Sequence, residues 1–227
     1  MPGTLHVLLV RHGESVGNAG QATEDAASTE LTALGVRQAE AVAAALPGEP
    51  ALIVVSAYAR SQRTAEPARA RFPHVPVEVW PVHEFTYLGP QAYAGTTVEE
   101  RRPAVDQYWH AADPHLVAGE GAESFAAFIG RVGDVRERLE RAAASPVVIF
   151  SHKKFINALL WTWLAGAPAV SSRRMGRYRG FDHAMALPNG GCIDLRIERG
   201  ADSPGAPGLA RVWLSPVRTR HLEGLSA

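Results

Sequence analysis

The stretch of sequence that decides the fold is residues 8–15, Leu-Leu-Val-Arg-His-Gly-Glu-Ser. An apolar run that starts near Leu5 predicts a buried strand, and this run ends abruptly at Arg11, His12 and Gly13. In α/β folds, functional sites form where strands end. An arginine beside a histidine supplies a fixed positive charge and a ring nitrogen that titrates near neutral pH. The combination indicates phosphate chemistry with His12 as nucleophile, although a lone motif of this kind also fits a strand followed by a plain polar turn.

The composition favours one α/β domain without a strong overall charge. The 227 residues include 23 Lys plus Arg and 23 Asp plus Glu, a formal net charge of zero. No global basic field recruits a polyanion, so we expect no nucleic-acid or membrane partner, and any affinity for phosphate must be local. The length suits a single domain over residues 1–227, with a lid or insertion around residues 84–121.

Cysteine usage and apolar run lengths bear on the compartment. Cys192 is the single cysteine, which excludes an intramolecular disulfide and a cysteine metal cluster. The N-terminus carries no signal-like segment, and no apolar run is long enough for a membrane span. We therefore expect a cytoplasmic protein, and a homodimer stays open.

Strand and helix signals alternate along the chain. Compact apolar runs predict strands at residues 5–10, 51–55, 77–82, 146–150, 192–197 and 209–214. Capping and periodicity signals predict helices at residues 32–46, 59–71 (with Pro67 as a kink or break), 98–111, 125–139 and 155–164. This order predicts a three-layer α/β/α sandwich with a mostly parallel central sheet, and an insertion that covers the C-terminal strand ends.

Three of the predicted strands end in polar residues. These are Arg11-His12, Ser56 and Ser151-His152. In a parallel sheet such ends lie on one edge, so we expect the three segments to converge on one site.

Six short motifs follow one another over residues 5–195. They are Arg11-His12-Gly13-Glu14-Ser15 with Asn18, Leu31-Thr32-Ala33-Leu34-Gly35, Ser56-Ala57-Tyr58-Ala59-Arg60 with Thr64-Ala65, Glu84, Gly121-Ala122-Glu123-Ser124-Phe125, and Ser151-His152. Each motif is weak alone, but the ordered set resembles the histidine phosphatase superfamily, also called phosphoglycerate-mutase-like, and within it the phosphatase branch.

The resemblance implies a catalytic set of His12, Arg11, Arg60, His152 and Glu84. To attack phosphorus, His12 needs one neutral ring nitrogen free and the other held by a hydrogen bond. Arg11 and Arg60 offer planar forks that match phosphate oxygens, and the resemblance places His152 in the same pocket as a further donor. Such groups can replace the metal ions used elsewhere for phosphoryl transfer, so we expect neither metal nor cofactor.

Glu84 is the candidate general acid. It would protonate the leaving alkoxide and then act as the base for the water that hydrolyses the phosphohistidine. Desolvation by Phe85 and Tyr87 would favour its protonated form. Without the other motifs, an ordinary solvated carboxylate would be the simpler interpretation.

Four further residues are candidate substrate contacts. Gly13 lets the phosphoryl group approach the backbone, and Asn18 can donate one more hydrogen bond. Ser15 either caps a turn or contacts phosphate. Arg63 lies three residues after Arg60 on the same helix, where it either reaches substrate or forms a surface ion pair.

Two features depart from the family pattern. Lys153 and Lys154 stand where the family commonly has glycines. They either narrow the pocket, depress the pKa of His152, bind a second anionic group of the substrate, or extend to solvent. The segment after Glu84 does not resemble the longer insertion by which the mutases bind phosphoglycerates.

The leading interpretation is a metal-independent phosphomonoester hydrolase that acts on a small phosphorylated metabolite through phosphorylated His12. One alternative is a phosphoglycerate mutase, which the missing insertion disfavours. Another is a non-catalytic protein that binds phosphorylated ligands, which the complete catalytic set disfavours.

Overall fold

The computed structural model describes residues 4–166, 169–198 and 211–216. Its strands are β1 (Thr4–Arg11), β2 (Leu52–Val55), β3 (Val77–Val79), β4 (Val147–Ser151), β5 (Cys192–Glu198) and β6 (Arg211–Pro216). They form one sheet in the order β3-β2-β4-β1-β5-β6. The pairs among β3, β2, β4 and β1 are parallel, whereas β5 runs antiparallel to both β1 and β6. The predicted mostly parallel sheet is confirmed.

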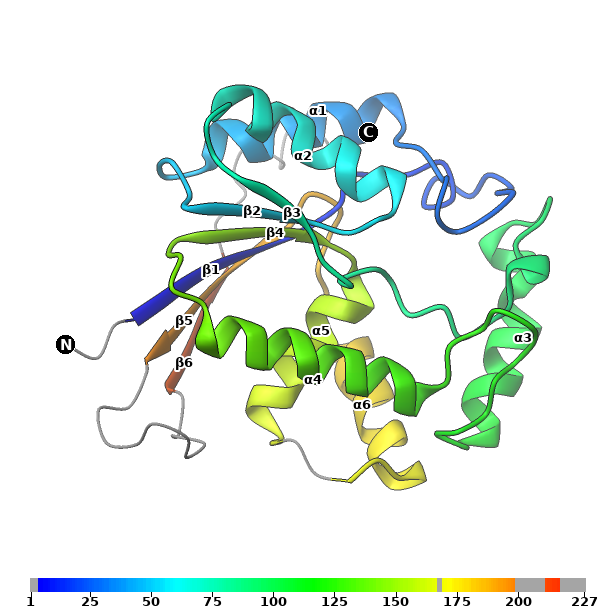
Figure 1. Ribbon diagram of the computed structural model, residues 1–227. Helices are drawn as coiled ribbons and strands as arrows, with labels where there is room; N and C mark the ends of the chain where they lie inside the picture. The colour runs from blue at the N-terminus through cyan, green and yellow to red at the C-terminus, as the bar shows by residue number, and fades with distance from the viewer. Residues whose placement is uncertain (1–3, 167–168, 199–210, 217–227) are drawn as a thin grey trace.

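Helices cover both faces of the sheet (Figure 1). One face carries α1 (Ala33–Ala45) and α2 (Ala59–Arg71), and the other carries α4 (Phe125–Arg141), α5 (Lys153–Leu164) and α6 (Ser172–Ala184). The insertion holds η1 (Pro90–Ala92) and α3 (Val98–Ala111), and it lies beyond the C-terminal ends of the parallel strands. The predicted α/β/α sandwich with an insertion at the strand ends is confirmed.

Three details differ from the sequence prediction. α2 continues through Pro67 because Ala65 and Ala68, fully buried on either side of it, hold the helix against the sheet. β3 ends at Val79 rather than at residue 82, because Pro81 has no N–H to donate to the ladder. α6 was not predicted. The Gly/Pro-rich residues 200–208, which predict a loop, lie outside the described residues. So do residues 209–210, at the start of the last predicted strand.

The insertion is anchored to the core by aromatic packing. The five apolar positions predicted for α4 (Phe125, Phe128, Val132, Val135 and Leu139) are all buried. Phe85, at the start of the insertion, stacks on Phe128 with ring centroids 4.3 Å apart. This pair packs the residue that follows Glu84 into the core.

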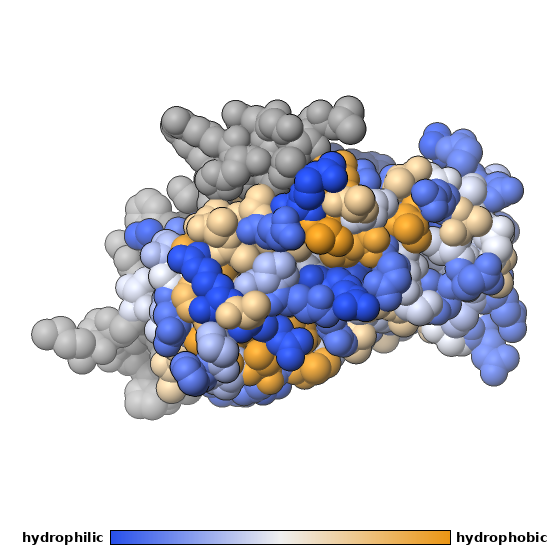
Figure 2. Space-filling view, turned by 90° about the horizontal axis from the view of Figure 1, so that it is seen from above, coloured by the Kyte–Doolittle hydropathy of each residue, from blue (hydrophilic) through white to orange (hydrophobic). Residues whose placement is uncertain are grey.

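The face of the molecule that carries α1 and α2, opposite the face with α4, α5 and α6, is mostly hydrophilic. Figure 2 views the molecule from this side and shows several smaller hydrophobic areas separated by hydrophilic residues. Among the described residues, no helix combines the length and apolarity that a membrane crossing requires.

Gly35, at the start of α1, packs directly against the loop that follows β1. A Cβ on Gly35 would lie 2.0 Å from the Glu14 carbonyl oxygen. We therefore expect Gly35→Ala to lower the free energy of unfolding by about 2–3 kcal/mol, the range for overpacking. Gly130→Ala is the matched control, because a Cβ there meets nothing within 4 Å inside α4 and should stabilise by about 0.5–1 kcal/mol. Urea unfolding measures both, and equal effects of the two changes would contradict this account.

Candidate active site

Three strand ends meet at one edge of the sheet. β1 and β4 are neighbours, with Arg11 opposite Ser151, and the His12 N–H donates to the Ser151 carbonyl at 3.0 Å. Ser56 follows β2, the other neighbour of β4. The predicted convergence is confirmed, and it brings His12, Ser56 and His152 together.

His12 is 3% exposed, and both of its ring nitrogens have a partner. Nδ1 lies 2.7 Å from the Gly13 carbonyl oxygen, which can only accept, so Nδ1 carries the proton. Nε2 lies 3.2 Å from Nε of Arg60, which can only donate, so Nε2 presents its lone pair. This is the tautomer that an attack on phosphorus requires.

Two arginines surround this lone pair with donors. Arg60, in the first turn of α2, is buried and also donates to the Ala26 carbonyl. Arg11 donates from Nη1 to the Leu187 carbonyl at 2.6 Å, while its Nε is buried without a partner among the described residues. Since buried donors normally have acceptors, the free Nε indicates an anion site. Within residues 4–166, 169–198 and 211–216, no group of three or more His, Cys, Asp or Glu side chains is arranged to hold a metal ion.

His152 faces His12 at the N-terminus of α5. The two ring centroids lie 5.0 Å apart, and His152 is fully buried. Its Nε2 lies 2.8 Å from the Ser56 hydroxyl, whereas its Nδ1 is buried with no partner in the described part of the chain. A ligand oxygen beside Nδ1 would complete its hydrogen bonding.

Burial makes both histidines hard to protonate. It lowers the pKa of His12 well below the usual 6.5, and the charges of Arg60 and Arg11 lower it further. The pKa of His152 is also lowered well below 6.5, first by burial and then by Arg60. Burial and then Arg131 lower the pKa of nearby His83 to about 4. His12 and His152 are therefore neutral rings near pH 7. The lowering at His152 comes from burial and Arg60, not from the lysines that follow it in sequence.

These pKa shifts predict a loss of stability on mild acidification. Below pH 6.5 the unfolded chain protonates His12 and His152 while the folded chain does not, so the free energy of unfolding falls as the pH falls. Each ring contributes up to about 1.4 kcal/mol per pH unit, from pH 6.5 down toward its folded-state pKa. Urea unfolding at pH values down to about 5 measures how the free energy of unfolding depends on pH. His152→Gln should reduce this slope by the contribution of one histidine ring. An unchanged slope in that variant would contradict the shift assigned to His152.

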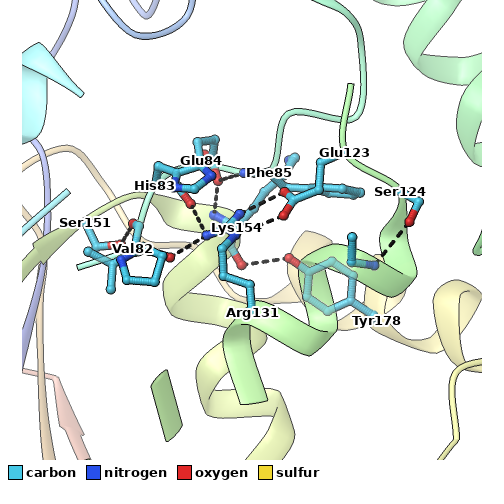
Figure 3. Close-up of polar contacts among 12 residues, drawn as sticks. Val82, His83, Glu84, Phe85, Glu123, Ser124, Arg131, Ser151, Lys154 and Tyr178 are labelled. Atoms are coloured by element: carbon cyan, nitrogen blue, oxygen red, sulfur yellow. Dashed lines mark hydrogen bonds and ion pairs between the residues drawn. The ribbon is translucent and has the colours of Figure 1, made fainter. Parts of the chain in front are cut away.

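Glu84 lies on irregular backbone at the N-terminus of α5 (Figure 3). Its Oε1 accepts from the Lys154 N–H at 3.1 Å and from the Phe85 N–H at 3.2 Å. The ring of the preceding residue, His83, lies 5.4 Å from that of Tyr58, which in turn lies 5.3 Å from that of His152.

The two lysines after His152 bind α6. Lys153 donates from Nζ to the Asp182 carbonyl at 2.8 Å, and Lys154 pairs with the Asp182 carboxylate at 3.2 Å. Asn157 donates to the same carboxylate at 2.8 Å. Of the four alternatives for the two lysines, extension to solvent does not describe these contacts, and the substrate contact of Lys153 stays a prediction.

Arg63 does not join the cluster. Its side chain is 55% exposed and pairs with Glu66 at 3.0 Å and with Glu30 at 3.5 Å. Of the two alternatives for Arg63, the surface ion pair describes the structure, because this side of α2 faces the surface.

The loop after His12 is held by its own hydrogen bonds. Ser15 is buried and its hydroxyl donates to Oδ1 of Asn18 at 3.0 Å, which is a turn-forming contact. Asn189 also donates to this oxygen, at 3.0 Å, so the exposed Asn18 keeps its amide N–H groups for a ligand. The Gly13 N–H donates to Thr64 Oγ1 at 3.0 Å, so this amide is already used in the structure.

Several residues of the site escaped the sequence analysis. Ser56 is predicted as a strand end and as part of a motif but not as a contact of His152, and Asp182 and Leu187 come from the unpredicted α6 region. Asn189 begins an Asn-Gly-Gly sequence that is typical of a turn, and the structure shows its amide donating to the His12 carbonyl at 3.1 Å. The Asn-Gly-Gly turn was the one signal that could have indicated this contact.

This fold and this histidine pocket define a class of protein. A model of the histidine phosphatase superfamily (branch 1) matches residues 7–179. The chain belongs to that superfamily. Among curated proteins, a search found no match.

Solved structures of phosphatases resemble the chain over nearly its whole length. An Escherichia coli protein assigned as an alpha-ribazole-5'-P phosphatase has a TM-score of 0.71 and 21% identity, over 95% of this chain and 98% of its own. A mycobacterial glucosyl-3-phosphoglycerate phosphatase has a TM-score of 0.67 and 24% identity, over 94% and 98%. A variant phosphoserine phosphatase of Entamoeba histolytica, complexed with phosphoserine, has a TM-score of 0.66 and 20% identity, over 96% and 99%.

Proposed function

We propose that this chain is a phosphomonoesterase that transfers a phosphoryl group to His12 and then to water without a metal ion. The observation that carries the proposal is the lone pair on Nε2 of His12, which accepts from Nε of Arg60. It lies among the donors of Arg60, Arg11 and His152, two of which have buried nitrogens without partners. A nucleophile surrounded by unused donors is what phosphoryl transfer requires.

In the first step, Nε2 forms a bond to phosphorus as the ester P–O bond breaks. In the structure, the Arg60 Nε–H donates to Nε2 of His12. When substrate binds, it donates to a phosphoryl oxygen instead. Arg11 and His152 donate to the same group as its charge spreads in the transition state. Glu84 gives its proton to the leaving oxygen.

In the second step, water attacks the phosphorylated ring. Glu84, now a carboxylate, takes one proton from the water as its oxygen bonds to phosphorus and the P–N bond breaks. The products are inorganic phosphate and His12 with its Nε2 lone pair restored. Glu84 ends protonated, as it began.

A small phosphorylated metabolite is the substrate class we propose. The relatives named above are phosphatases of alpha-ribazole-5'-P, glucosyl-3-phosphoglycerate and phosphoserine, all small molecules. Phe85 is buried, so the half-buried Tyr87, whose ring lies 5.2 Å from that of Phe85, is the aromatic residue next to Glu84 that would limit the leaving group. The single cysteine, Cys192, supports a cytoplasmic location.

The test is phosphate release from a panel of phosphorylated metabolites, with the His12→Ala protein as the blank. Phosphate release from at least one member, absent from the blank, supports the proposal. Efficient conversion of 3- to 2-phosphoglycerate without release would identify a mutase. Tight phosphate binding with no turnover would identify a binding protein.

A further inference from the structure

Glu84 lies on a stretch of chain that no strand supports. β3 ends at Val79, and residues 81–87 form no ladder or bridge with another strand. An irregular segment normally varies in position, yet a general acid must lie within hydrogen-bond reach of the leaving oxygen. The position of Glu84 therefore depends on side chains that bind this backbone.

Arg131 of α4 supplies most of those contacts (Figure 3). Its Nη1 donates to the carbonyls of Pro81, at 2.6 Å, and His83, at 3.0 Å, on both sides of Val82. The Val82 carbonyl accepts from the Ser151 hydroxyl at 2.6 Å. The three carbonyls that precede Glu84 are thus all held by side-chain donors.

Glu123 holds Arg131 in place and binds the other side of Glu84. Its carboxylate accepts from Arg131 in a bidentate pair, at 2.9 Å from Nε and 2.8 Å from Nη2. Its own N–H donates to the Thr86 carbonyl at 2.8 Å. The two side chains are only 12% and 15% exposed, so water does not replace these bonds when one is lost.

We propose that Arg131 and Glu123 are positioning residues for Glu84, which hold the acid at the distance from the leaving oxygen that proton transfer needs. This inference rests on the proposed function. Glu123 belongs to one of the six motifs, yet neither of the two proposed chemical steps uses it. The bidentate pair with Glu123 fixes the plane of the Arg131 guanidinium. The guanidinium in turn fixes the carbonyls of Pro81 and His83 near Glu84.

Arg136 of the same helix is the matched control. It pairs with Glu140 at 2.8 Å and donates to the Thr162 carbonyl at 2.7 Å, so it makes the same kinds of bonds away from Glu84. Arg136→Gln should lose a comparable amount of stability and leave the kinetics unchanged.

We expect Arg131→Gln to lower kcat for an alkyl phosphate roughly 10- to 100-fold, the scale of a misplaced catalytic group, with KM little changed. Phosphorylation of His12 by p-nitrophenyl phosphate, followed as the first burst of nitrophenolate, should change little, because this leaving group departs without a proton. Arg131→Lys, which keeps the charge but not the fork, should recover part of the loss. If Arg131→Gln does not fold, Glu123→Gln carries the same test, since it removes the charge that holds the Arg131 guanidinium in the plane of its carbonyl contacts.

A double variant separates positioning from structure. Arg131→Gln added to Glu84→Gln should slow the alkyl phosphate no further, because both changes remove one function. Additive losses, or equal losses with both leaving groups in the rate of His12 phosphorylation, would overturn the positioning role. If Glu84→Gln alone leaves the alkyl phosphate unaffected, the acid role in the proposed function fails, and the positioning role fails with it.

Discussion

His12→Ala should take up no covalent phosphate and lose about 10⁴-fold or more of its turnover, the scale for removing a covalent nucleophile. The native protein, mixed with a radiolabelled phosphate ester and quenched during turnover, should carry label that survives alkali and is lost in acid, as a phosphohistidine does. The reason is that Nε2 of His12 presents a nucleophilic nitrogen lone pair beside Arg60, with unpartnered buried nitrogens on Arg11 and His152.

His6→Ala is the control for labelling. His6 lies on the same strand at its other end, where it pairs with Asp194 at 2.6 Å, so its loss should leave the label intact. Label that persists in His12→Ala and disappears in His152→Ala would transfer the nucleophile role to His152. No label on the native protein, with phosphate still bound, would favour a binding protein.

Glu84→Gln should slow hydrolysis of alkyl phosphates by about 10²–10⁴-fold, the usual contribution of a general acid. The glutamine carbonyl can still accept from the Lys154 N–H, so the local structure is kept while the proton donor is lost. Phosphorylation of His12 by p-nitrophenyl phosphate should be much less affected, because nitrophenolate is a stable leaving group.

Glu66→Gln is the matched control, since it removes a carboxylate that pairs with Arg63 at the surface. It should change neither substrate's rate. Equal losses for both substrates in the rate of His12 phosphorylation by Glu84→Gln would remove this residue from the acid role, and the acid would have to be another group beside His12.

Most elements of the fold follow from local signals in the sequence. The N-cap at Thr32, for example, predicts α1, and its hydroxyl accepts from the Gly35 N–H at 3.0 Å. α6 also has an N-cap, at Ser171, but two of its four buried residues, Arg174 and Asp182, are charged and hide the apolar period. Their burial depends on partners in other elements, and sequence periodicity does not contain those partners.

The site was predictable where it depends on strand ends, and unpredictable where it depends on long side chains. Parallel pairing alone brings His12 and His152 together. The direction of the Lys154 side chain depends on Asp182, 28 residues away on an unpredicted helix. The position of the backbone at Glu84 depends on Arg131, which binds the carbonyl of His83, 48 residues earlier in the chain. Such contacts require the packing of α4 and α5 to be known first.

The bond from Nδ1 of His12 to the Gly13 carbonyl bears on the lifetime of the proposed intermediate. A carboxylate in that place would add negative charge to the ring and make it a stronger base. A carbonyl is neutral, so it orients the ring without strengthening the P–N bond. When water attacks, the imidazole leaves as a weakly basic, neutral group. The phosphorylated protein should therefore discharge readily, as a hydrolase requires and a mutase must prevent.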